Sequence, residues 1–301
     1  MRLRILGSSS AIPTEERGLS AQFLHMGKHA LLIDCGEGTQ MQLRRFGEKW
    51  SAIRYVLISH LHGDHYFGLV SLLSTMHMLE RDKALDIYAP AGLEEIIRMQ
   101  FAASHTILRF ELNFHIIHTE EQYLLFEEND YRVFAIPLMH SRETYGFLIK
   151  EKTALRNIKK SFVAQHQIPY EWFPRIKAGE DYIDASGKRW RNNDITDAPK
   201  APASYAYFSD TAYIPERADD IAGLSVLYHE ATFLEEDVDK AELRKHSTAR
   251  QAANMAKLAS AGQLILGHFS TRYPSVEKFE EEAKEIFANT ALAFDGMEIE
   301  I

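Results

Sequence analysis

Several features that would assign a protein to a class at once are missing from this sequence. It has a single cysteine, Cys35, so an internal disulfide is impossible. No apolar run approaches the ~20 residues that a membrane-spanning helix needs, and residues 1–7 are too short an apolar stretch for a signal peptide. No internal repeat or low-complexity tract is present. These absences exclude a disulfide framework and predict a cytoplasmic protein without a membrane segment.

An overall excess of basic charge is also missing. The net charge is −9, which argues mildly against a nucleic-acid binder because lysine and arginine make most phosphate contacts. The charge is unevenly distributed, however: from Arg142 to Arg191 there are 11 basic and 6 acidic residues, which leaves −14 for the rest of the chain. This basic stretch is either a solvated surface loop or a surface for a polyanion.

Short β-rich runs alternate with amphipathic helical patterns, which indicates one α/β domain over residues 1–301. Residues 150–203 differ, because prolines, glycines and charges interrupt any period there. A compact core seldom contains so long an irregular segment, so we interpret it as a functional excursion from the domain. Further along the chain, Ser247 is expected to cap a helix that runs to about Ala259.

The strongest signal is a cluster of imidazoles and a carboxylate that follows the apolar strand expected at 55–58. It reads Ser59-His60-Leu61-His62-Gly63-Asp64-His65. A lone histidine is more often structural than a ligand, but four candidate ligands within six residues predict a metal site. Two zinc ions, for example, need roughly seven or eight protein contacts and leave a position open for water, and this motif supplies four.

Three more candidate ligands each follow an expected strand. They are His140, Asp210 and His268. Taken singly, each is as readily a structural residue. Together they supply the missing ligands at strand ends, where α/β proteins place their sites.

The order His-x-His-x-Asp-His, then a histidine, an aspartate and a final histidine, resembles the metallo-β-lactamase superfamily. Several flanking segments are similar to ribonuclease Z in particular, and the resemblance extends from Leu6 to Tyr273. These segments are Leu6-Gly7-Ser8-Ser9-Ser10-Ala11-Ile12-Pro13-Thr14, Asp34-Cys35-Gly36-Glu37-Gly38-Thr39-Gln40, Leu72-Leu73-Ser74-Thr75-Met76, His229-Glu230-Ala231-Thr232-Phe233, His246-Ser247-Thr248-Ala249 and Gly267-His268-Phe269-Ser270-Thr271-Arg272-Tyr273.

The resemblance implies a metallo-β-lactamase fold, a four-layer αββα sandwich with an inserted arm and two zinc ions per chain. The implied ligands are His60, His62 and His140 for one zinc, Asp64, His65 and His268 for the other, and Asp210 between them. Asp34 is expected to orient the ligand loop.

The same resemblance implies an endoribonuclease that removes the 3′ trailer from precursor tRNA. Asp64 is the expected proton acceptor for the attacking water, and His246, held by Glu230, the expected proton donor to the leaving 3′-oxygen. Residues 150–203 correspond to the family's arm for gripping tRNA, and the basic candidates there are Lys159, Lys160, Arg175 and Lys177. A homodimer is also implied.

The chain departs from the family pattern at several points. Ser209 precedes Asp210 where glycine is usual, Arg17-Gly18 stands in place of Arg-Asn, and residues 168–174 of the arm contain no glycine. Two other functions stay open on residues alone. One is a hydrolase of small phosphodiesters or lactones, which would leave the basic arm unexplained. The other is a catalytically silent relative that binds RNA or protein, in which gaps among the seven ligands would be expected.

Overall fold

The computed structural model describes residues 1–301, which divide into two compact units. The first unit contains residues 1–127, 133–149 and 203–301, and the second contains residues 128–132 and 150–202. None of the helices combines the length and apolar character that a membrane crossing requires.

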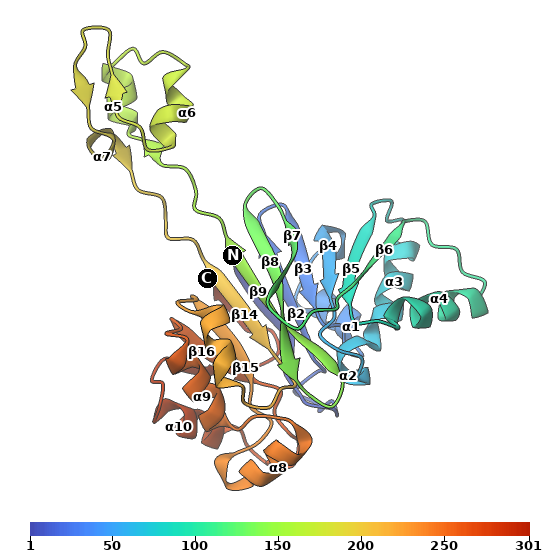
Figure 1. Ribbon diagram of the computed structural model, residues 1–301. Coiled ribbons are helices and arrows are strands. Elements are labelled where there is room, and N and C mark those ends of the chain that lie inside the picture. The colour runs from blue at the N-terminus through green and yellow to red at the C-terminus, as the bar shows by residue number, and fades with distance from the viewer. The chain divides into compact units, whose positions relative to one another are not determined.

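The first unit contains two seven-stranded sheets, drawn in Figure 1. The strand order of the first sheet is β18-β1-β2-β3-β4-β5-β6. Its strands are β1 (Arg2–Gly7), β2 (Ala21–Met26), β3 (His29–Ile33), β4 (Ile53–Leu57), β5 (Leu85–Ala89), β6 (Leu112–Ile116) and β18 (Glu298–Glu300). From β3 to β6 the strands are parallel, so the carboxyl ends of β3 and β4 lie at the same edge.

The second sheet has the order β17-β16-β15-β14-β9-β8-β7. Its strands are β7 (Tyr123–Glu127), β8 (Tyr131–Met139), β9 (Glu143–Glu151), β14 (Ser204–Phe208), β15 (Val226–Glu230), β16 (Gln263–Gly267) and β17 (Thr290–Leu292). β14, β15, β16 and β17 are parallel, so residues that follow β14 and β16 meet at one edge.

Helices cover the outer face of each sheet, which gives four layers. A buried apolar cluster joins the first sheet to α1 (Thr39–Arg45), α3 (Gly68–Met78) and α4 (Leu93–Ala103). A second cluster joins the other sheet to α9 (Ala249–Leu258) and α10 (Glu277–Lys284). The remaining helical segments of this unit are α2 (Gly63–Tyr66), α8 (Val238–Arg244) and three 3₁₀ turns at Trp50–Ala52, Pro215–Ile221 and Glu235–Asp237.

Buried tyrosines of β14 connect the inner faces of the two sheets. Tyr205 and Tyr207 are two residues apart and therefore share one face of the strand. The Tyr205 hydroxyl donates to Gln22 Oε1 on β2, and the Tyr207 hydroxyl donates to Asp34 Oδ2 just after β3. Both tyrosines are at most 1% exposed, so the contact between the sheets includes polar bonds that are shielded from water.

The helix expected after residue 247 forms, but its cap is one residue later than we predicted. Thr248 is the N-cap of α9 and forms a capping box with Gln251. The Ser247 hydroxyl instead donates to the main-chain carbonyl of Thr211 at 2.7 Å. Two adjacent hydroxyl residues were equally suited to capping, and this tertiary bond decides between them.

The second unit has a small apolar core of its own. Phe162, Ile176, Tyr182 and Ile195 are buried in it, with Trp172 packed against them. Its elements are β10 (Asn157–Ile158), α5 (Lys160–Gln165), α6 (Trp172–Lys177), β11 (Tyr182–Ile183), β12 (Arg189–Trp190), α7 (Asn192–Ile195) and β13 (Thr196–Asp197). β10 pairs with β13, and β11 with β12. The segment expected to be irregular therefore contains regular structure around a core of four buried residues.

Candidate metal centre

The histidine motif begins immediately after β4 and enters the short helix α2. His60 and His65 are fully buried, whereas His62 is half-buried. Gly63 allows the close turn between them, because a Cβ there would lie 2.2 Å from the Phe67 ring. The motif thus turns back on itself, as four converging side chains require.

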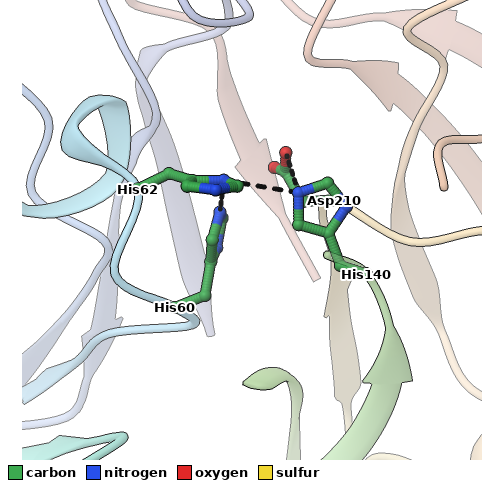
Figure 2. A group of neighbouring side chains, drawn as sticks. All are labelled: His60, His62, His140 and Asp210. Atoms are coloured by element: carbon green, nitrogen blue, oxygen red, sulfur yellow. Dashed lines mark hydrogen bonds and ion pairs between the residues drawn. The ribbon is translucent and has the colours of Figure 1, made fainter. Parts of the chain in front are cut away.

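Figure 2 shows the first group of predicted ligands, His60, His62, His140 and Asp210. His62 Nδ1 lies 3.0 Å from His60 Nε2 and 3.3 Å from His140 Nε2. Zinc–nitrogen bonds of about 2.0–2.1 Å at tetrahedral angles separate ligand atoms by about 3.3 Å. Both distances from His62 Nδ1 are therefore close to the edge length of one coordination tetrahedron.

The second group consists of Asp64, His65 and His268. Asp64 Oδ2 lies 3.5 Å from His65 Nε2 and 3.7 Å from His268 Nε2. Asp210 Oδ2 lies 2.9 Å from His65 Nε2 and 3.2 Å from His268 Nε2, while its Oδ1 lies 3.8 Å from His140 Nε2. Asp210 thus presents one carboxylate oxygen to each group.

Two buried ring nitrogens show how well the donor set fits a metal ion. His65 Nε2 and His268 Nε2 are shielded from water, and although Asp210 Oδ2 lies 2.9 and 3.2 Å away, neither nitrogen forms a hydrogen bond of acceptable geometry. A buried polar atom without a partner is rare and costly. Their Nδ1 atoms are already bonded, to Asp34 Oδ2 and to the Thr232 hydroxyl, which leaves the Nε2 atoms facing the centre. Metal coordination supplies the missing partner, so the donor set fits a metal ion.

Electrostatics favour the neutral imidazole that a metal binds in the first group. Burial holds the pKa of His60 well below its ordinary value, and the neighbouring His65 lowers it further. Burial also lowers the pKa of His62 and of His140. A neutral ring keeps its lone pair available to a cation.

Asp34 gathers four hydrogen bonds beneath the ligand loop. Its Oδ1 accepts from the Ser59 main-chain N–H at 2.7 Å. Its Oδ2 accepts from the Ser59 hydroxyl at 2.9 Å, from His65 Nδ1 at 2.7 Å and from the Tyr207 hydroxyl at 2.7 Å. Sequence reasoning identified Asp34 but missed Ser59 and Tyr207. Strand periodicity pairs Tyr207 with Tyr205 on one face, but it does not reveal which face looks toward Asp34.

Glu230 and His246 lie together beside the ligands. Glu230 is fully buried at the end of β15, and its Oε1 accepts from His246 Nδ1 at 2.8 Å and from the Thr211 N–H at 2.8 Å. Its Oε2 accepts from the Thr232 hydroxyl at 2.6 Å. Burial lowers the pKa of His246, but the Glu230 carboxylate outweighs this effect and raises the pKa to about 9. The pair can therefore hold a proton on the His246 imidazole, which lines a pocket together with Asp64, His140 and Asp210.

The basic residues predicted to bind substrate all lie in the second unit: Lys159, Lys160, Arg175 and Lys177. Two of them are engaged within that unit. Lys159 Nζ donates to a main-chain carbonyl at 2.8 Å, and Arg175 pairs with Glu180 at 2.8 Å. Lys160 is exposed and Lys177 half-buried, and neither side chain has an ion pair or hydrogen bond. These two lysines are the freer candidates for a phosphate contact.

A family model described as Anti-Pycsar protein Apyc1 matches residues 1–161, and this part of the chain belongs to that family. A ribonuclease Z of Bacteroides thetaiotaomicron is 40% identical over 300 residues, 99% of this chain and 95% of that protein. The crystal structure of human tRNase Z, short form, is similar with a TM-score of 0.74 and 29% identity, and the match covers 100% of this chain and 99% of that one. The metallo-β-lactamase fold protein YhfI from Bacillus subtilis, at 16% identity and a TM-score of 0.70, covers 99% of this chain and 98% of that one and supports the fold alone.

Two facing sheets covered by helices, with a histidine–aspartate cluster that could hold metal at their edge, define a protein of the metallo-β-lactamase fold. The family model ends before Asp210, Glu230 and His268, whereas the ribonuclease Z relatives match the chain over nearly its full length. The chain belongs to the ribonuclease Z family and is an endoribonuclease that processes the 3′ end of tRNA. The predicted fold class, family and activity are confirmed, and the small-molecule hydrolase and the silent relative are the less supported alternatives.

Proposed function

We propose that the chain is a two-zinc enzyme that removes the 3′ trailer from precursor tRNA, leaving a tRNA 3′-hydroxyl and a 5′-phosphorylated trailer. The three histidines of the first group would hold one zinc, the three residues of the second group would hold the other, and Asp210 would serve both. The single observation that carries this proposal is the division of the Asp210 carboxylate, one oxygen of which faces each group. An imidazole-rich set of this size is suited to zinc.

When bound, the two ions supply charge neutralisation for the phosphate and activation of the attacking water. Asp64 accepts the proton of that water as the oxygen–phosphorus bond forms. Its Oδ2 is held by the Ala11 N–H at 2.9 Å and faces the ligand histidines, while its Oδ1 makes no hydrogen bond within the protein. The free oxygen is therefore available to the proton.

His246 donates a proton to the tRNA 3′-oxygen as the phosphorus–oxygen bond breaks. Its Nδ1 is bonded to Glu230, so Nε2 is the atom that can reach the leaving group. The buried carboxylate favours the protonated ring and fixes its orientation. Glu230 acts through His246 and is a positioning residue.

The second unit is proposed to be the tRNA-gripping arm, inserted as residues 150–203 into the single domain of residues 1–301. Support comes from its position between β9 and β14, which are neighbours in the sheet, and from its basic charge. We place Lys160 and Lys177 among its phosphate contacts, with Lys159 and Arg175 beside them. We also propose that the protein works as a homodimer in the cytoplasm, for which an equilibrium sedimentation experiment is the direct test.

The test combines zinc counting with mapping of the cut. Purified wild type should contain about two zinc ions per chain and should cut a 5′-labelled precursor tRNA at the trailer junction, leaving a 3′-hydroxyl. His62→Ala should retain about one ion, because it removes a ligand of one group only. Asp210→Ala should lose both, because it serves both groups. Equal zinc content in the two variants would contradict the bridging role, and a cut elsewhere would contradict the substrate assignment.

A further inference from the structure

The wall of the metal pocket carries only two cationic side chains outside the histidines. The pocket has a volume of about 730 Å³ and lies over Asp64, His140 and Asp210. Arg244 and Lys245, adjacent in the chain, are its only arginine and lysine. They belong to the end of α8 and the turn that leads into His246. In a protein of net charge −9, this turn is the place where the pocket offers fixed positive charge to a phosphate.

Lys245 fixes this turn to the ligand His140 by two hydrogen bonds. Its main-chain carbonyl accepts from His140 Nδ1 at 3.0 Å, and its Nζ donates to the His140 carbonyl at 3.2 Å. It adopts a left-handed backbone with φ of +55°, which a lysine takes up only when its surroundings require it. The polar groups of Lys245 are thus used within the protein, and its two hydrogen bonds hold the turn beside His140.

The side chains of the two residues before Lys245 are exposed and are held by no hydrogen bond or ion pair. Arg244 is exposed, and its guanidinium has neither an ion pair nor a side-chain hydrogen bond. Leu243 is 84% exposed although it lines the pocket. A fixed backbone thus presents a free guanidinium and an uncovered apolar side chain to the same cavity. Guanidinium groups bind phosphate through two parallel N–H donors, and apolar side chains pack against the faces of bases.

We propose that Arg244 binds the phosphate on the 5′ side of the last nucleotide of the product tRNA, and that Leu243 packs against the base of that nucleotide. The choice of side rests on the proposed role of His246. This residue follows the turn directly and protonates the 3′-oxygen of that same nucleotide, so the turn borders the tRNA side of the scissile phosphate and not the trailer side.

Arg244→Ala tests the phosphate contact, with Lys257→Ala as the matched control. Lys257 is an exposed cation on α9 that does not line the pocket. Arg244→Ala should raise KM for precursor tRNA about tenfold with less than a twofold change in kcat, because the contact is present before and during the reaction. It should also lower the salt slope of binding by about one. Lys257→Ala should leave both unchanged.

Three substrates decide which phosphate is bound: the natural precursor, one with a methylphosphonate on the 5′ side of the last tRNA nucleotide, and one with a methylphosphonate at the first linkage inside the trailer. The methylphosphonate on the 5′ side of the last tRNA nucleotide should abolish the difference in KM between wild type and Arg244→Ala. The methylphosphonate inside the trailer should preserve that difference. The reverse pattern, or an equal effect of Lys257→Ala, would overturn the proposal. Failure of the His246 role would show separately, in the leaving-group dependence of His246→Ala.

Leu243→Ala tests the base contact independently. It should raise KM about threefold without changing the salt slope, because the removed contact is apolar. This increase should disappear on a precursor that carries an abasic residue at the last tRNA position. An unchanged KM, or an increase that persists on the abasic substrate, would refute the base contact.

Discussion

Replacing Tyr207 by phenylalanine removes one hydroxyl from the hydrogen-bond set that supports His65, a proposed metal ligand. The hydroxyl donates to Asp34 Oδ2 at 2.7 Å, and the same oxygen accepts from His65 Nδ1 at 2.7 Å. Tyr207 is 1% exposed, so no water can take over the lost bond without entering the contact between the sheets. The ring itself stays, and with it the stacking on Tyr228 at 5.2 Å.

The magnitude follows from the charge of the acceptor. A hydrogen bond to a charged group contributes about 1.5–3 kcal/mol, and loss of a residue that orients a metal ligand lowers metal affinity by about 10–100-fold. Asp34 keeps three of its four donors in the variant, which favours the lower end of that range. We therefore expect zinc to bind about tenfold more weakly to Tyr207→Phe.

The control is Tyr205→Phe. Tyr205 lies two residues earlier on β14, is equally buried and also donates to a side chain of the first sheet, Gln22, but it does not touch Asp34. Zinc affinity would be measured by competition with a chromogenic chelator, and thermal unfolding of the metal-free proteins would give the loss of stability. Both variants should lose similar stability, but only Tyr207→Phe should lose zinc affinity. Equal affinities, or equal losses in both variants, would refute the reasoning.

Three other changes test the remaining roles. Asp64→Ala should abolish turnover and lower the zinc content, because it removes a ligand and the proton acceptor; retained activity would exclude that role. Replacing residues 154–201 by a Gly–Ser linker should sharply reduce cleavage of precursor tRNA but largely spare hydrolysis of bis-nitrophenyl phosphate, whereas equal losses would make the arm structural. Wild-type cleavage should also weaken with added salt. His246→Ala should slow precursor cleavage by ~10²–10⁴-fold with unchanged zinc content and should matter less for a nitrophenolate leaving group, which needs no proton. The double variant of His246→Ala and Glu230→Gln should lose less activity than the two single losses combined, because the two residues act together. Losses that simply add would argue against a shared role.

Local pattern made the candidate ligands predictable from the sequence. Each group of candidates follows a strand that apolar runs had indicated, and the parallel pairing of β3 with β4 and of β14 and β16 with β15 brings most of these positions to the edges of the sheets. The hydrogen bonds around the ligands were not predictable in this way. Ser59 and Thr232 are small hydroxyl residues of a kind found throughout the chain, and their roles arise only when loops far apart in sequence meet. The core of the second unit was missed because four buried side chains spread over 150–202 give no period.

Backbone strain at the centre also explains why one departure from the family pattern is tolerated. Asp34, Asp210 and His268 follow β3, β14 and β16, and all three have left-handed backbones, with φ of +56°, +52° and +58°. Such a conformation costs a non-glycine residue about 1–3 kcal/mol. Glycine would remove this cost, but it has no carboxylate or imidazole. The three positions therefore keep a strained backbone, which turns their side chains toward the centre.

Ser209, where the family usually has glycine, does not share that strain. It is absent from the residues with positive φ, is fully buried, and its hydroxyl donates to Asp210 Oδ2 at 3.1 Å. Since the left-handed turn is made by Asp210, the residue before it needs no glycine, and a serine can instead hold the carboxylate oxygen that faces His65 and His268. The substitution therefore adds a hydrogen bond to the carboxylate that faces both ligand groups and leaves the backbone turn unchanged.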